Sequence, residues 1–148
     1  MSRPEPPGAG AVRAAIEDPT GYLRAAMPMC ATLGFVADRV DTESVEVSVV
    51  WSEGLCTANG VIHGGVVMAL ADAAGALLAY LNLPEGAAGT TTIESKTNFL
   101  GAARNGTLTA TARILHAGRT TIVVETDLAT ADNPVAKTTQ TQLVLLPR

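Results

Sequence analysis

One long apolar run, residues 64–81, constrains the fold of this chain more than any other feature of its sequence. Its composition of Ala, Gly, Leu and Val predicts a single helix over Gly65–Leu81 that is apolar nearly all round. Such a helix has to be buried on most of its sides. The run is about one bilayer thickness long, but its small residues and one carboxylate, Asp72, favour a helix buried inside a soluble protein.

Segments with a period of two surround this helix, as is typical of strands. Two strands are predicted before it, at residues 34–41 and 44–51. Four more follow it with short breaks between them, at residues 90–100, 106–117, 120–130 and 134–146. Breaks this short fit hairpins and hence an antiparallel meander, whereas parallel crossovers need about a dozen residues or more. We therefore expect an α+β fold, in which a sheet of about five or six strands wraps around one long central helix.

The length of 148 residues favours one domain. Residues 1–10 contain three prolines and two glycines and predict a disordered tail, so the single domain is expected to occupy residues 11–148. Within it, residues 11–31 carry a weak helical pattern that Pro19 and Pro28 interrupt.

Composition excludes several classes of function. A net charge of −4 and only five aromatic residues argue against nucleic-acid binding. Two histidines and two cysteines outside any CxxC pair argue against a metal site, and the missing GxGxxG and GxxxxGK[ST] motifs argue against a nucleotide cofactor. Residues 1–21 contain no apolar segment like that of a signal peptide. We expect a cytoplasmic protein with reduced cysteines and no membrane association, metal or cofactor.

Asp72 is the sharpest chemical anomaly of the sequence. It is the only acidic or basic side chain between His63 and Glu85, and its immediate neighbours are leucine and alanine. A carboxylate in such surroundings is costly to bury unless it is paired. An aspartate that reaches solvent or caps a loop would carry no function, but the apolar neighbours favour a functional carboxylate in a cleft. A serine nucleophile is not expected, because no GxSxG motif is present.

A second feature is the pair Gly64 and Gly65 at the predicted start of the helix. Glycines there allow the backbone N–H groups to approach a ligand, and the helix dipole favours negative charge. The arrangement suits the oxyanion of a thioester or ester under attack, although ordinary turn chemistry also explains it. His63 either polarises this carbonyl or the leaving sulfur, or only caps the helix. Asp72 lies about 12 Å further along the helix axis than Gly64, so in one chain the two flank opposite ends of an extended group.

The run Gly60-x-x-His63-Gly64-Gly65-x-x-x-x-Leu70-x-Asp72 resembles the helix-start signature of hotdog-fold acyl-CoA thioesterases. It is most similar to their phenylacetate-pathway (PaaI-type) and 4-hydroxybenzoyl-CoA thioesterase branch.

Two later segments add to this resemblance. Residues 92–100 are similar to the family's next strand, and residues 116–119 to a later hairpin. The resemblance extends over about residues 34–146.

The resemblance implies roles for the residues at the helix start. The N–H of Gly64 would polarise the thioester carbonyl, and His63 would help to position it. Asp72 would act as a general base on water, or as a nucleophile through a mixed anhydride. It would work with the helix start of the neighbouring subunit across a homodimer, which removes the problem of their separation.

The resemblance also points to a hydroxyl on the next strand that assists the water. Thr92 matches that place best, with Thr91 and Thr90 as register alternatives. Relatives often carry Asn or Gln six residues before the histidine. Here that position is Thr57; either Asn59 replaces the amide through a shift of the loop, or the amide's role is missing.

Coenzyme A would need cations for its phosphates. Arg119 in the hairpin is the first candidate and Arg104 the second, with Gly65 binding substrate at the helix start; Lys96 and Arg113 are weaker alternatives.

The expected protein is therefore a homodimeric acyl-CoA thioesterase, or a homotetramer made of two such dimers, acting on aryl- or medium-chain acyl-CoA. Two alternatives stay open: a hotdog enoyl-CoA hydratase or dehydratase, and a non-catalytic acyl-CoA or acyl-carrier binding protein. The depth of the acyl pocket is expected to depend on the partner subunit and on Met68, Leu77, Phe99 and Leu100.

Overall fold

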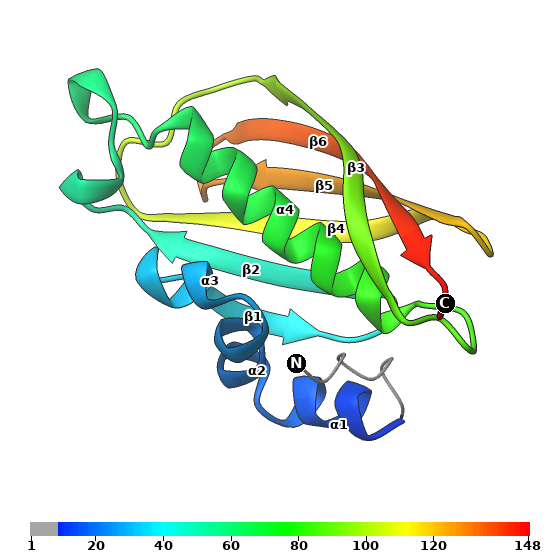
Figure 1. The fold of residues 1–148 in the computed structure, drawn as a ribbon. Coiled ribbons are helices and arrows are strands. Elements are labelled where there is room, and N and C mark those ends of the chain that lie inside the picture. The colour runs from blue at the N-terminus through cyan, green and yellow to red at the C-terminus, as the bar shows by residue number, and fades with distance from the viewer. Residues whose placement is uncertain (1–8) are drawn as a thin grey trace.

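The structure is a computed structural model that describes residues 9–148, in which one long helix lies against a curved sheet (Figure 1). The elements in chain order are α1 (Ala9–Glu17), α2 (Pro19–Ala26), α3 (Pro28–Thr32), β1 (Val36–Val40), β2 (Ser44–Val50), the 3₁₀ turns η1 (Glu53–Leu55) and η2 (Ala58–Gly60), α4 (Gly64–Leu81), β3 (Gly89–Phe99), β4 (Thr107–Ala117), β5 (Thr121–Ala129) and β6 (Pro134–Leu145).

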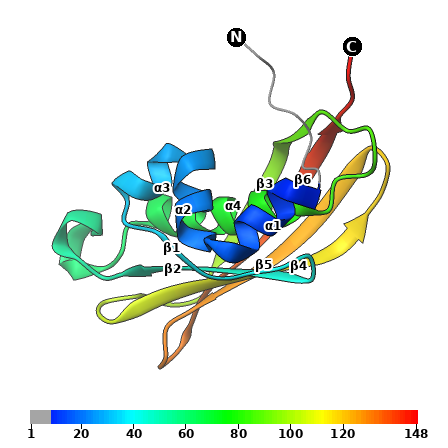
Figure 2. The same cartoon turned by 90° about the horizontal axis from the view of Figure 1, so that it is seen from below.

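The six strands form one sheet in the order β1-β2-β4-β5-β6-β3, and every neighbouring pair is antiparallel. The sheet curls, so that α4 lies in its concave side and contacts strands from β2 to β3. Figure 2 shows all four helices on this same side of the sheet. The predicted α+β architecture, with its single long helix and antiparallel sheet, is confirmed.

The predicted meander is right for β4, β5 and β6 but wrong for β3. That strand pairs with β6 at one edge of the sheet, and β4 pairs with β2 instead. The reason lies in the connecting residues 100–106, which do not turn back on β3. Leu100 donates its N–H to the carbonyl of Val135 at 2.8 Å, and Ala103 accepts from the N–H of Ile62 at 2.9 Å. The segment therefore crosses the end of the sheet past the start of α4.

Helix α4 begins at Gly64, one residue before the predicted start. Leu70, Ala74 and Leu78 on it are completely buried. The helix is long and apolar enough to cross a membrane by length and composition alone. Its packing inside the curled sheet accounts for much of that composition, because 56% of its residues are buried.

The weak helical pattern before β1 forms three short helices, and both prolines stand where predicted. Pro19 opens α2 and Pro28 opens α3, positions at which a missing N–H costs nothing. Arg24 ties α2 to the sheet through a hydrogen bond of 2.9 Å from its Nε to the carbonyl of Phe35. Of the predicted tail at residues 1–10, the last two residues belong to α1 and the others lie outside the described residues.

Candidate active site

His63 is the N-cap of α4. Its Nδ1 accepts a hydrogen bond of 2.8 Å from the N–H of Gly65, so the neutral ring carries its proton on Nε2. A Cβ on residue 65 would come within 3.0 Å of this Nδ1. Glycine is thus required for the imidazole to fold over the helix end. Capping, one of the two roles considered for His63, is confirmed, and it leaves the Nε2–H side of the ring exposed.

Gly64 provides the first N–H of the helix. Its N–H finds no acceptor in the described part of the chain, whereas those of the next three residues do. The ring of Phe99, at the end of β3, lies against this glycine, because a Cβ there would be 3.3 Å from its Cζ. The helix start therefore offers one unused donor beside an aromatic ring that is 52% exposed.

Asp72 is half-buried and is held by one of its two oxygens. Its Oδ1 accepts from the hydroxyl of Thr92 at 3.0 Å and from Nε2 of Gln140 at 3.2 Å. Its Oδ2 receives no donor from residues 9–148. The carboxylate is thus fixed through Oδ1, and Oδ2 is left to act on a substrate or water.

The choice among three threonines is settled by these contacts. Thr92 reaches Asp72, Thr91 is exposed, and Thr90 donates to the carbonyl of Leu143 at 3.1 Å instead. Of the three, Thr92 is thus the one that contacts the carboxylate, and its part in the reaction stays a prediction.

A buried amide sets the direction of the Thr92 hydroxyl. Gln142 donates from Nε2 to the Thr92 oxygen at 2.6 Å, and its Oε1, at 3.2 Å from the Thr90 hydroxyl, shares that hydroxyl's one proton with the Leu143 carbonyl. Because the Thr92 oxygen already accepts from Gln142, its own proton is directed to Asp72. Four side chains from two strands and a helix thus form one continuous chain of hydrogen bonds.

Sequence reasoning missed Gln140 and Gln142, which are 0% and 1% exposed. Glutamine is ordinarily a surface residue, but these two share the inner face of β6 with Val144, a period-two signal that could have placed them inside. The Oε1 of Gln140 has no hydrogen-bond partner in the described part of the chain. Gly75 makes room for it, since a Cβ on that helix position would overlap this oxygen.

A β-bulge in β3 places the hydroxyls toward the helix. The pairing with β6 shifts between Thr92 and Glu94, so Ile93 is an extra residue that is 57% exposed. As a result Thr92 pairs opposite Gln142 and Ser95 pairs opposite Gln140. Thr92 and Ser95 are three positions apart, whereas Gln140 and Gln142 are two apart. Both therefore lie on the inner face, which a regular strand would not allow.

The two halves of the predicted site do not meet within one chain. Asp72 and Gly64 lie on the same straight helix, and eight residues correspond to about 12 Å of rise.

The predicted substrate-binding residues also lie at separate places in one chain. Asn59, in the loop before α4, has a left-handed backbone (φ 63°), and its carbonyl accepts at 2.7 Å from Nη1 of Arg104, which lies in the β3–β4 connection. Arg119 lies in the β4–β5 turn, just before Thr121, which is level with the β3 residue Thr91 across the intervening strand β6. Since Phe99 marks the helix start, Arg119 is about 25 Å from it along the strands. The structure does not bring the two arginines together in one chain.

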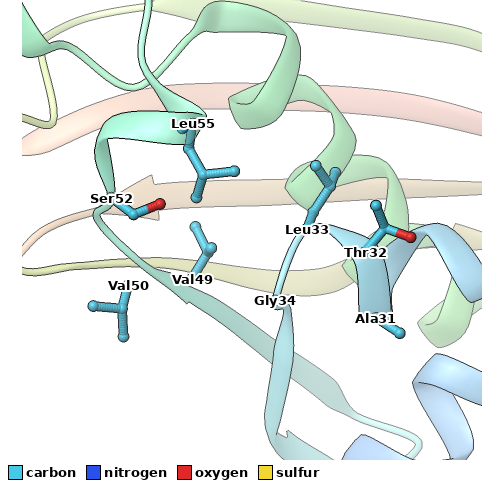
Figure 3. A pocket seen from close by; sticks show the side chains of 9 residues that line it. Ala31, Thr32, Leu33, Gly34, Val49, Val50, Ser52 and Leu55 are labelled. Atoms are coloured by element: carbon cyan, nitrogen blue, oxygen red, sulfur yellow. The ribbon is translucent and has the colours of Figure 1, made fainter.

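Two cavities stand out, and they differ in position. One of about 450 Å³ lies between the end of α3 and η1, and Leu33, Val49, Ser52 and Leu55 are among the residues that line it (Figure 3). It contains none of the predicted site residues. The other, of about 360 Å³, lies between α2, α4 and β3, and Leu77 is among its lining residues. Met68, Phe99 and Leu100 do not line this second cavity.

Among residues 9–148, no three His, Cys, Asp or Glu side chains gather to hold a metal ion.

The helix start, Asp72 and Thr92 lie in the part of the chain that matches a known family, and Gln140 and Gln142 follow just after it. Residues 59–137, just over half of the chain, match the family model of the thioesterase superfamily. The chain belongs to the thioesterase superfamily. It has the hotdog fold of that family and is a thioester hydrolase.

Several solved structures resemble this thioesterase along most of its length. A mutant of thioesterase PA1618 from Pseudomonas aeruginosa is 29% identical, with a TM-score of 0.78 over 85% of this chain and 93% of that one. A thioesterase family protein from Silicibacter pomeroyi is 28% identical, with a TM-score of 0.80 over 94% and 98%. A phenylacetic acid degradation-related protein from Ralstonia eutropha is 30% identical, with a TM-score of 0.73 over 82% and 96%.

Proposed function

We propose that this thioesterase hydrolyses acyl-CoA thioesters and that Asp72 carries the reaction. The observation that supports this most directly is the asymmetry of the carboxylate: two donors hold Oδ1, and Oδ2 is open. A carboxylate held in this way keeps a fixed orientation toward a reacting carbonyl, which is what general-base or nucleophilic catalysis requires.

In the general-base route, Oδ2 takes a proton from water as the water oxygen bonds to the thioester carbonyl carbon. The C–S bond then breaks, the free acid forms, and the CoA thiolate leaves and takes up a proton. In the nucleophilic route, Oδ2 itself attacks that carbon, the thiolate leaves, and water hydrolyses the mixed anhydride. Thr92 assists by holding the carboxylate, or by orienting the water through its hydroxyl.

The oxyanion of either route needs a donor, and the N–H of Gly64 supplies it. Because Gly64 and Asp72 of one chain are too far apart, we propose that Asp72 of one subunit acts with the helix start of its neighbour in a homodimer. Strand β3 supports this: it is an edge strand, and three apolar residues on or just after it, Ile93, Phe99 and Leu100, are more than half exposed. Edge strands of this kind are ready to pair with a second chain. Two such dimers would form the tetramer.

For coenzyme A, Arg104 is the better candidate, since it lies in the loop beside the helix start. Arg119 would contribute only if the neighbouring subunit brings its β4–β5 turn to the same site. Asn59 and Gly65 complete the proposed binding loop. A cytoplasmic location is part of the same proposal.

The acyl group is proposed to be an aryl or medium-chain one. The Ralstonia eutropha relative is described as phenylacetic acid degradation-related, and this chain shares 30% of its residues with that protein.

The test is release of free CoA thiol from a panel of thioesters that includes phenylacetyl-, benzoyl- and hexanoyl-CoA. We expect steady turnover on at least one aryl or medium-chain member. Interconversion of enoyl-CoA and 3-hydroxyacyl-CoA would identify a hydratase instead, and tight binding of intact thioesters would identify a non-catalytic binding protein. Either of these results, without thiol release, would contradict the proposal.

A further inference from the structure

The second cavity described above lies directly along α4 from the carboxylate. Ala76 lies one helical turn after Asp72, and Tyr80 lies two turns after it. The three residues therefore share one face of the helix. Ala76 and Tyr80 line the cavity of about 360 Å³, together with Tyr22, Ala26 and Met27 from the N-terminal helices and Thr90 from β3. A group that enters beside Asp72 can therefore extend along this face toward Tyr80.

The described residues of the cavity wall carry no charge at neutral pH. Alanines, Leu77 and Met27 make its apolar part, and two phenols and the hydroxyl of Thr90 make its polar part. Its volume is at the lower end of the range of about 300–1,000 Å³ for small-molecule sites. A compact, uncharged group fits these walls, whereas a carboxylate, a phosphate or a long hydrocarbon chain does not.

The chain's only two tyrosines meet at the far end of this cavity. Tyr22 on α2 and Tyr80 on α4 both line it, and burial together with the neighbouring Tyr80 phenol raises the pKa of Tyr22. Tyr80 lies about 12 Å beyond Asp72 along the helix axis. The two phenols thus face the cavity from both helices at a set distance from the carboxylate.

Helix α3 is also close to the carboxylate. Burial raises the pKa of the Cys30 thiol, the Arg24 guanidinium opposes this, and the negative charge of Asp72 adds to the increase. Helix α2 lines the cavity beside α4 through Tyr22 and Ala26. The N-terminal helices lie outside residues 59–137, the part of the chain that matches the family model.

We propose that this cavity holds the acyl group of the thioester, and that the Tyr22–Tyr80 pair closes its end and so limits the acyl group to an aryl or medium-chain length. The proposal rests on the proposed function for its substrate, but the cavity can be tested separately.

Two neighbouring alanines on α2 provide a matched pair of variants. Both Ala25 and Ala26 are exposed, but only Ala26 lines the cavity. We expect Ala26→Leu to lower kcat/KM for phenylacetyl- and hexanoyl-CoA about tenfold and to leave that for acetyl-CoA within about twofold. Ala25→Leu should leave kcat/KM unchanged for all three substrates. Equal losses on acetyl- and phenylacetyl-CoA, or no difference between the two variants, would overturn the assignment.

The length limit is tested by Tyr22→Ala, with Tyr22→Phe as its control. The Ala variant should raise the ratio of dodecanoyl- to hexanoyl-CoA hydrolysis about tenfold or more, because it opens the end of the cavity. The Phe variant keeps the ring and should keep the ratio. An unchanged ratio in a folded Tyr22→Ala protein would overturn the limit.

A binding measurement separates failure of this site from failure of the proposed function. The phenacyl thioether of CoA cannot be hydrolysed and can be titrated by calorimetry. If the wild type hydrolyses no thioester but binds this compound, and Ala26→Leu weakens binding about tenfold while Ala25→Leu does not, the function fails and the acyl site stands. If thioesters are hydrolysed and Ala26→Leu changes neither binding nor selectivity, the acyl site fails and the function stands.

Discussion

Thr92 on β3 donates its hydroxyl to Oδ1 of Asp72 on α4 at 3.0 Å, and so links the edge strand of the sheet to the buried helix. The bond has a direction, because Gln142 donates to the same hydroxyl oxygen from the other side. The carboxylate is therefore oriented by the sheet as well as by its own helix, and each part of this arrangement can be changed separately.

Thr92→Val removes the hydroxyl and keeps the shape of the side chain. Asp72 then loses one of its two donors, and the Gln142 amide loses its acceptor. We expect kcat to fall about 10- to 100-fold with little change in KM, the effect of removing a group that orients a reacting one. Steady-state thiol release measures this. Thr92→Ser should recover most of the activity, and failure to do so in a folded protein would contradict the role of the hydroxyl.

Gln140→Met separates positioning from stability. Methionine has nearly the same length and volume, so it fills the site but cannot donate to Asp72. It also removes the unpartnered Oε1, whose burial costs about 1–3 kcal/mol. We expect an unchanged or higher Tm together with a lower kcat and an unchanged KM. A fall in Tm with unchanged kcat would show that Gln140 only supports the core.

His63 is tested with two substitutions that differ in capping. His63→Ala removes the acceptor of the Gly65 N–H and should lower the free energy of unfolding by about 1 kcal/mol. His63→Asn restores a capping oxygen but not the imidazole Nε2–H. If the ring also positions the carbonyl, the Asn variant recovers stability in denaturant unfolding and stays low in kcat/KM. Recovery of both stability and kcat/KM by the Asn variant would show that His63 only caps the helix.

The periodicity of the sequence predicted much of the fold, because strands and the apolar helix follow local patterns. The pairing of β3 with β6 could not be predicted in this way. A hairpin is inferred from the length of a connection, whereas residues 100–106 are held by hydrogen bonds to Val135 and Ile62, which are distant in sequence.

In the candidate site, too, some residues could be predicted from the sequence and others could not. Asp72 is conspicuous in the sequence because it is the one charge in an apolar helix, and Thr92 followed from a family resemblance. Gln140 and Gln142 were missed since a glutamine is normally expected in solvent. The Tyr22–Tyr80 contact depends on how α2 packs on α4, which no local pattern in either segment specifies.

The two cysteines should differ in reactivity with a thiol reagent. Cys30 is completely buried, and its raised pKa leaves less thiolate at any given pH than an ordinary thiol has. Cys56 is only half-buried, at an isolated bridge before α4. At pH 8 we expect one thiol per chain to react quickly in the native protein, and the second only on unfolding. Cys56→Ser should remove the fast phase; two fast thiols in the wild type would contradict this packing of α3.

The most direct test of the central claim is the turnover of Asp72→Asn. Asparagine keeps the size of the side chain, and its Oδ1 can still accept from Thr92 and Gln140, but its amide can neither take a proton from water nor attack a thioester. We predict that kcat for release of free CoA thiol falls about 10²- to 10⁴-fold, with an unchanged circular dichroism spectrum and undiminished binding of the phenacyl thioether of CoA. Near wild-type turnover by the folded variant would contradict the assignment of the reaction to Asp72.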